Sequence, residues 1–252
     1  MLKIYLDWNC ITNNRYGFVE LARKYRNTIL FPYTREHIRD LLVSSNHKEE
    51  FKEGLYVLEK TCGDNFLKIY KDEAILLTYN VHKYYRLNGW IIKLIQKPFN
   101  LISKRQYKYL RNTAQLSEKE QNEIRRKDAS EVIEYLDRLV LARNLGSSLE
   151  NFTSKYIPRC NWLYNTSSRL NGVYFALDML GYHSDKKSEK RFSFTNLAID
   201  ANHVTNAIYC DCFITADCRQ RIKAEAIYAR YGCPTKIFSP EEIKEYIENN
   251  IP

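Results

Sequence analysis

The residues of this sequence that are best suited to chemistry are acids that follow apolar segments. Asp7 directly follows the mostly apolar residues 2–6, and Asp217 lies two residues beyond the mostly apolar residues 212–215. Short apolar runs of this kind are typical of buried strands. Active groups in open parallel sheets lie just beyond the carboxyl ends of the strands. We therefore expect these two aspartates to share one edge of a sheet.

Further acids lie on segments with helical spacing. Asp40 lies on the helix expected to begin after Thr34, with Glu36 one turn earlier on the same face. Asp200 lies on the helix that leads into the strand before Asp217, and His203 shares its face at a spacing of three residues. The simpler alternatives are that Asp40 is a solvated helix acid and that His203 only packs or caps.

Several converging carboxylates repel one another, and a cation is needed to make their proximity tolerable. Oxygen ligands without a sulfur partner suit Mg²⁺ or Mn²⁺. Such ions activate a water molecule and stabilise the charge of a phosphoryl group in transfer. The cysteines at positions 210, 212, 218 and 233 match no standard zinc spacing. The acids therefore predict a magnesium or manganese site that is suited to chemistry at a phosphoryl group.

The elements that must position these acids lie at the two ends of the chain. We expect strands at residues 2–6, 28–33, 212–215 and 235–238, each followed by a helix. This alternation predicts an α/β fold. Thr34 is a plausible N-cap, and Ser239-Pro240-Glu241-Glu242 has the residues of a helix start. We predict one core formed by residues 1–47 and 192–252.

Residues 48–191 are expected to form a helical insertion or subdomain. We find no strand signal between 48 and 190, and Ile75, Leu76 and Tyr79 have helical spacing. Ser117 and Glu120 form a capping-box pattern at the start of a helix predicted over 117–145. Within the insertion, residues 166–180 are also a predicted helix, and 184–191 is predicted to be a charged loop. A further helix is predicted at 195–209, where the core resumes.

The insertion also contains cations interleaved with aromatic residues. Such a face can follow a phosphate backbone and stack bases, although a solvated helix face with long lysine side chains has the same composition. Tyr84-Tyr85-Arg86 is a shorter example. The residues that we assign to nucleic-acid binding are Lys104, Arg105, Tyr107, Lys108 and Arg111.

Three blocks of the sequence resemble PIN-domain nucleases of the bacterial PIN-like type. The first block, KIYLDWN, covers 3–9, and the second, YTREHIRDL, covers 33–41. The third and most specific block has DANH at 200–203, followed by YCDCFITAD at 209–217. The resemblance spans roughly 1–45 and 194–250, less than half of the chain. Nothing in the helical middle contributes to it.

The resemblance implies a three-layer α/β/α fold with a mostly parallel central sheet. It implies metal ligation by four acids, with Glu36 as the second choice for the acid in the second block. Asp211 is a further candidate ligand, although its position before a strand suits a role in orienting the backbone. Thr215 is implied to support the acids, and Asn9 is a candidate for support or for helix capping. The four acids are Asp7, Asp40, Asp200 and Asp217.

The composition agrees with a protein that binds polyanions. The 252 residues contain 39 Lys and Arg against 30 Asp and Glu, a net charge of +9, and include 20 Tyr. A basic, tyrosine-rich surface suits nucleic acid. No apolar run is long enough for a transmembrane helix, and an acid at position 7 interrupts any signal peptide. With seven cysteines, an odd number that fits free thiols, we expect a cytoplasmic protein.

We therefore expect a divalent-metal-dependent nuclease, an endoribonuclease that leaves a 5′-phosphate and a 3′-hydroxyl, as the resemblance implies. Its substrate would be RNA or single-stranded DNA. Fold-level analogy adds a role as a toxin or phage-defence effector, with an antitoxin or another partner protein bound to the insertion. The alternative is a catalytically inactive PIN-like module that binds nucleic acid or protein.

Overall fold

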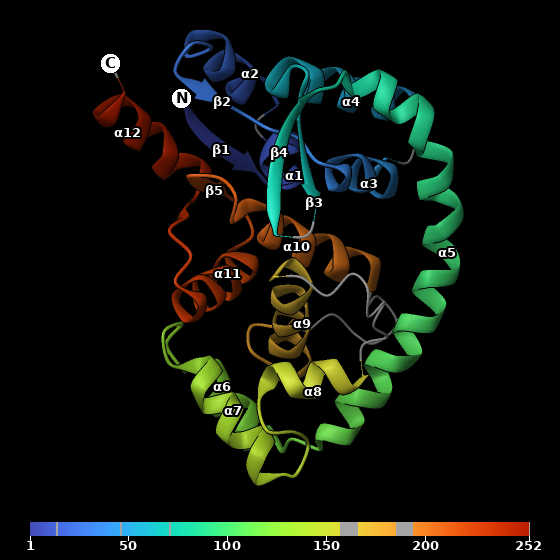
Figure 1. Ribbon diagram of the computed structural model, residues 1–252, viewed down its shortest axis with the longest axis vertical. Coiled ribbons are helices and arrows are strands. Elements are labelled where there is room, and N and C mark those ends of the chain that lie inside the picture. The colour runs from blue at the N-terminus through green and yellow to red at the C-terminus, as the bar shows by residue number, and fades with distance from the viewer. Residues whose placement is uncertain (14, 46, 71, 157–165, 185–193, 252) are drawn as a thin grey trace. The chain divides into compact units, whose positions relative to one another are not determined.

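The structure is a computed structural model, and it groups the chain into two compact units (Figure 1). The sheet unit comprises Met1–Ile95, Asn206–Cys218 and Pro234–Pro252, and the helical unit comprises Gln96–Thr205 and Arg219–Cys233. The residues that the structure describes are 1–13, 15–45, 47–70, 72–156, 166–184 and 194–251.

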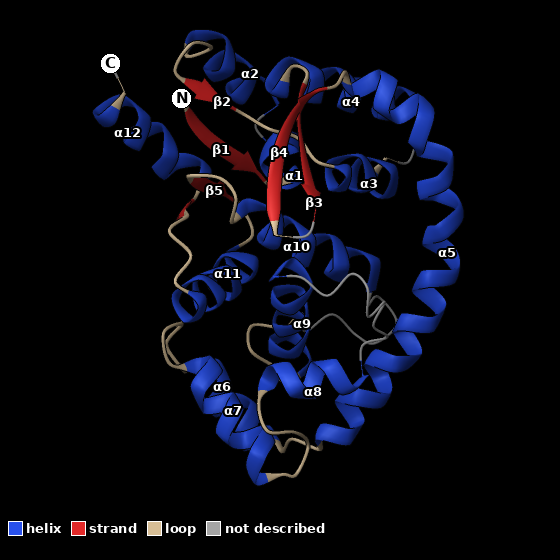
Figure 2. Ribbon diagram, viewed as in Figure 1, coloured by secondary structure: helices blue, strands red, loops and turns tan. Residues whose placement is uncertain are grey.

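The sheet unit is built around a four-stranded sheet in the order β2-β1-β5-β6, shown in red in Figure 2. Every pair of neighbouring strands is parallel. The prediction of an α/β fold with a parallel sheet is therefore confirmed. The strands are β1 (Leu2–Leu6), β2 (Ile29–Leu30), β5 (Cys212–Ile214) and β6 (Lys236–Phe238).

Strand β1 lies at the centre of the sheet, and its sequence explains why. Ile4, Tyr5 and Leu6 are all fully buried, so both faces of the strand are covered. Continuous apolar runs of this kind are characteristic of parallel sheets with both faces packed. The register pairs Leu6 with Ile214 of β5. The residues that directly follow β1 and β5 therefore leave the sheet at the same edge.

Helices of varied length complete the sheet unit. Thr34 caps α3 as predicted, and Ser239 caps α12 with Pro240 in the first turn, also as predicted. The helices of the sheet unit are α1 (Trp8–Asn13), α2 (Arg15–Lys24), α3 (Arg35–Ser44), α4 (Lys48–Cys62), the first part of α5 (Val81–Ala114), and α12 (Pro240–Asn250).

An antiparallel hairpin of β3 (Asn65–Tyr70) and β4 (Glu73–Thr78) corrects the expectation that 48–190 contains no strand. Ile75 and Leu76 do not lie on a helix. Strand β4 is exposed along nearly its whole length, so its apolar residues do not alternate with polar ones. Without that alternation, the period of two that marks a strand is missing from the sequence.

In the helical unit, one predicted helix differs from the structure. The helix predicted over 117–145 is two helices, with a turn in which the Asp128 carbonyl accepts the backbone N–H groups of Glu131 and Val132. The capping box of Ser117 and Glu120 is confirmed. The helices are the remainder of α5, α6 (Glu118–Arg125), α7 (Val132–Ala142), α8 (Leu149–Tyr156), α9 (Thr166–Met179), most of α10 (Phe194–Ala207) and α11 (Cys218–Tyr231).

Two expectations from composition can be compared with the described residues. Among them, no helix is both long and apolar enough to cross a membrane. The cysteines that the structure describes are free: Cys10, Cys62, Cys210, Cys212, Cys218 and Cys233. Cys160 and nearly all of the loop predicted at 184–191 lie outside the described residues.

Candidate metal centre

Asp7 is fixed where β1 ends and α1 begins. Its backbone N–H donates to the Ile214 carbonyl of β5 at 2.8 Å, and its own carbonyl accepts the Cys10 N–H at 3.1 Å. Its side chain is fully buried. Burial, and after it the negative charge of Asp7, raises the pKa of the Cys10 thiol well above its usual range. Cys10 is therefore a neutral thiol at neutral pH, beside a buried acid.

Thr215 connects the two acids that were expected at this edge of the sheet. The Thr215 hydroxyl donates to Oδ2 of Asp7 at 3.5 Å. Oγ1 of Thr215 also accepts the backbone N–H of Asp217 at 3.1 Å. Asp217 is half-buried. The contact with Asp7 is at the long end of the hydrogen-bond range. This geometry places Asp7 and Asp217 at one sheet edge, and the supporting role of Thr215 stays a prediction.

Asp40 lies on α3, and His37 attaches the start of this helix to the end of β1. Nδ1 of His37 accepts the backbone N–H of Thr34 at 3.0 Å, so Nε2 carries the proton and donates to the Leu6 carbonyl at 2.8 Å. His37 is completely buried. It therefore joins the strand that ends at Asp7 to the helix that carries Asp40.

The sequence interpretation did not include His37. Its position, three residues after the N-cap Thr34, is the place where a Glu or Gln normally closes a capping box. A histidine at that position was the available signal, because an imidazole can accept the cap N–H and still donate from its second nitrogen.

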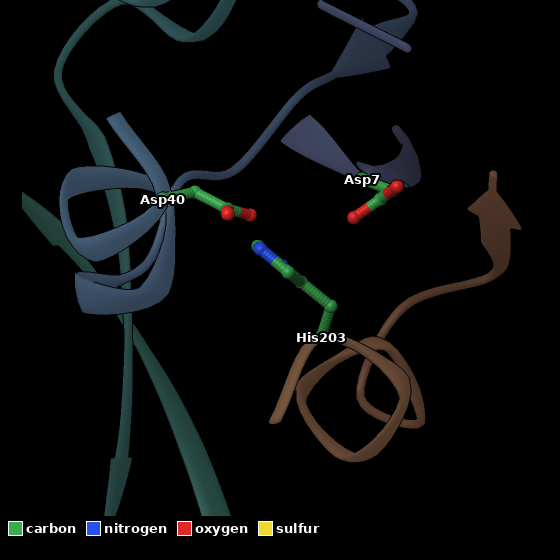
Figure 3. A group of neighbouring side chains, drawn as sticks. All are labelled: Asp7, Asp40 and His203. Atoms are coloured by element: carbon green, nitrogen blue, oxygen red, sulfur yellow. The ribbon is translucent and has the colours of Figure 1, made fainter. Parts of the chain in front are cut away.

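Asp7, Asp40 and His203 form a group that could hold a metal ion (Figure 3). Each offers one ligand atom, and these atoms lie within 4.8 Å of one another. Asp7 and His203 are buried, and Asp40 is half-buried. Figure 3 shows the two carboxylates and the imidazole directed toward a common point from β1, α3 and α10. His203 lies one turn before Asn206, at which the sheet unit resumes within α10.

The donor set of this group fits a divalent cation. Two carboxylate oxygens suit Mg²⁺ and Mn²⁺, and an imidazole nitrogen moves the preference toward the transition metals. The donors of this group are therefore ones that a divalent cation could use.

Three of the predicted site residues lie apart from this group. Glu36 is buried, and its carboxylate accepts a hydrogen bond from Arg39 at 2.6 Å. Asp211 is exposed before the start of β5, where its carboxylate accepts the Lys3 backbone N–H at 2.7 Å. Asn9 is exposed in the first turn of α1. Of the two acids proposed from the second block, the geometry places Asp40 in the group.

The remaining predicted residues belong to the helical unit. Asp200 is half-buried on α10, its backbone carbonyl accepts Nε2 of Gln220 at 3.3 Å, and it is outside the metal-competent group found among the described residues. The backbone of 104–111 is part of helix α5. Lys108 is exposed. The side chains of Lys104, Arg105, Tyr107 and Arg111 lie outside the described residues.

Comparisons with protein-family models, with curated proteins and with solved structures found no match to this chain.

Proposed function

We propose that the protein is a divalent-metal-dependent nuclease with a PIN-like core, and that its substrate is RNA. The observation that carries the proposal is the group of Asp7, Asp40 and His203, whose ligand atoms lie within 4.8 Å of one another. It lies where β1 ends, at the sheet edge at which active groups of parallel sheets occur. The net charge of +9 supports a polyanionic substrate.

In this proposal each residue has a defined task. Asp7 and Asp40 hold Mn²⁺ or Mg²⁺ together with His203, and Asp217 adds negative charge at the same sheet edge. The cation would supply the positive charge that polarises a phosphoryl oxygen and acidifies a water molecule. Thr215 keeps the Asp7 carboxylate in one orientation, and His37 keeps β1 and α3 together. The associated role as a toxin or phage-defence effector rests on analogy of fold.

Cleavage of 5′-labelled RNA, with single-stranded DNA in parallel, tests this function. We expect cutting by the wild type with Mn²⁺, none with EDTA, and losses of at least about a hundredfold in Asp7→Asn and Asp40→Asn, the scale on which single electrostatic contributors act. Asp211→Asn is the matched control, because its exposed side chain keeps an oxygen for the Lys3 N–H. It should cut like the wild type and yield 5′-phosphate ends.

Two results would contradict the proposal. Equal cleavage by Asp7→Asn and the wild type would remove these acids from the reaction. Absence of cleavage, combined with nucleic-acid binding that does not change with Mn²⁺, would instead identify a non-catalytic binding module. Titration calorimetry with Mn²⁺ supplies the second measurement, because it shows directly whether the protein binds the metal.

A further inference from the structure

A cavity of about 490 Å³ lies in the sheet unit, beside the start of α3. Its walls come from α3, from the hairpin β3–β4, from the start of α5 and from the last turn of α10. This volume falls within the range of sites that take small ligands or single groups of a polymer. The six lining residues that matter for binding are Arg35, Lys68, Tyr79, Tyr84, Asn88 and Asn206.

Two exposed cations, Arg35 and Lys68, line the cavity. Within the described part of the chain neither forms an ion pair. The acid of the same lining, Glu36, is already paired with Arg39 at 2.6 Å. The cavity wall therefore offers positive charge to an anionic ligand, and Arg35 adds a planar guanidinium that matches phosphate.

Two tyrosine rings form a fixed aromatic surface in the same cavity. The Tyr84 ring lies 4.7 Å from that of Phe66 and 5.8 Å from that of Tyr79, the latter pair edge to face. Both tyrosines are half-buried. Because packing already holds these nearly perpendicular rings, a planar ligand can stack on one ring and contact the other with little further loss of side-chain freedom.

Two side-chain amides add hydrogen-bonding groups. Nδ2 of Asn88 donates to the Tyr84 carbonyl at 3.1 Å, and Nδ2 of Asn206 donates to Oγ1 of Thr34 at 3.4 Å. With the amide nitrogens used in this way, the oxygens are the groups left to accept a hydrogen bond. Exocyclic amino groups of adenine, cytosine and guanine are donors of the matching kind.

We infer that this cavity binds one unpaired nucleotide of a single-stranded nucleic acid, with Tyr79 and Tyr84 against the base and Arg35 and Lys68 on the phosphates. Glu36 lines the cavity and Asp40 lies one turn further along α3, a rise of about 6 Å. The subsite therefore lies on the same helix as the proposed metal ligand. The inference rests on the proposed function only in treating the bound strand as the substrate.

Fluorescence anisotropy with a labelled 12-mer of riboadenosine, in EDTA, tests the subsite without cleavage. Arg35→Gln and Lys68→Gln should each weaken binding and reduce the slope of log affinity against log salt by about 0.7, the value for one phosphate contact of a single strand. Tyr79→Leu should weaken binding by roughly fivefold to a hundredfold. The matched control is Lys48→Gln on α4, an exposed lysine outside the lining, which should bind within about twofold of the wild type.

The inference is overturned if the Arg35 and Lys68 variants bind like the wild type, if Lys48→Gln loses as much as they do, or if a duplex of the same length binds equally well. The surface variants keep the test valid should Tyr79→Leu fail to fold. Failure here is distinct from failure of the nuclease function. If cleavage depends on Asp7 but the cavity variants bind normally, the subsite is refuted and the nuclease proposal stands. If the cavity variants bind weakly but the wild type does not cleave, the nuclease proposal is refuted and the subsite stands.

Discussion

At the scale of single residues, His37 helps to position the carboxylates of Asp7 and Asp40. One ring nitrogen accepts the Thr34 backbone N–H, and the other donates to the Leu6 carbonyl. His37 therefore acts as a positioning residue, because Leu6 precedes Asp7 in the chain and Asp40 lies one turn beyond His37.

We predict that His37→Ala weakens Mn²⁺ binding by about tenfold to a hundredfold, as loss of an orienting partner does at metal sites. It should also destabilise the fold by about 1–3 kcal/mol, because a buried backbone N–H and a carbonyl lose their partner. His37→Gln should recover part of the stability, since Gln can close the capping box. Calorimetric titration and denaturant unfolding measure both effects, and unchanged Mn²⁺ affinity in folded His37→Ala would contradict the positioning role.

Residue type and spacing could predict some site members and not others. Asp7 follows a strand whose last three residues are buried, a pattern visible in the sequence, and Asp40 follows from its helix face. Asp211 directly precedes β5, whereas Asp7 directly follows β1, so these two acids lie at opposite ends of parallel strands. Their separation depends on the register of the strands. Register is a tertiary property, and one residue of shift would change which side chains meet.

At the scale of elements, local chemistry was the most informative signal. Three helix starts, at Thr34, Ser117 and Ser239, were predicted from side chains that can satisfy the first backbone N–H groups, and all three are confirmed. The hairpin β3–β4 was missed because exposure of β4 removes the alternation that sequence interpretation needs. A strand held mainly by backbone pairing has little side-chain signature.

The capping box of α6 gives a pH prediction. Hydrogen bonds from the Ser117 hydroxyl and backbone, and then the Arg143 guanidinium, lower the pKa of Glu120 to about 2. A carboxyl whose pKa is lower in the folded state stabilises the fold above its unfolded pKa, and loses this effect as pH falls toward the folded value. We expect Glu120→Gln to be less stable than the wild type at pH 6.

Denaturant unfolding at a series of pH values measures this difference. It should be constant above about pH 5 and shrink between about pH 4.5 and pH 2, where Glu120 of the wild type takes up its proton. Glu118→Gln is a suitable control, because Glu118 lies in the same first turn outside the capping box. A difference between wild type and Glu120→Gln that does not change over this pH range would show that the carboxylate is not held as described.

At the scale of the whole molecule, the net charge is positive, whereas the candidate metal centre contains two acidic side chains. The chain is basic, with a net charge of +9, while its candidate centre gathers two carboxylates. The cavity cations Arg35 and Lys68 are 33 positions apart in the sequence, with Asn206 far beyond them. The sequence therefore indicated local runs, at 104–111 and at Tyr84-Tyr85-Arg86, and of their described residues only Tyr84 lines the cavity.

If the candidate centre binds Mn²⁺ only in the folded state, Mn²⁺ must stabilise the fold. A ligand bound only by the folded state at a hundred times its Kd adds about 2.7 kcal/mol. For a chain of this size that corresponds to a rise of roughly 5–10 °C in the unfolding midpoint. Differential scanning calorimetry with and without Mn²⁺ should show this rise in the wild type and in Asp211→Asn, but not in Asp7→Asn. Equal midpoints of the wild type in EDTA and in millimolar Mn²⁺ would mean that Asp7, Asp40 and His203 hold no metal, because binding to the folded state must raise its stability.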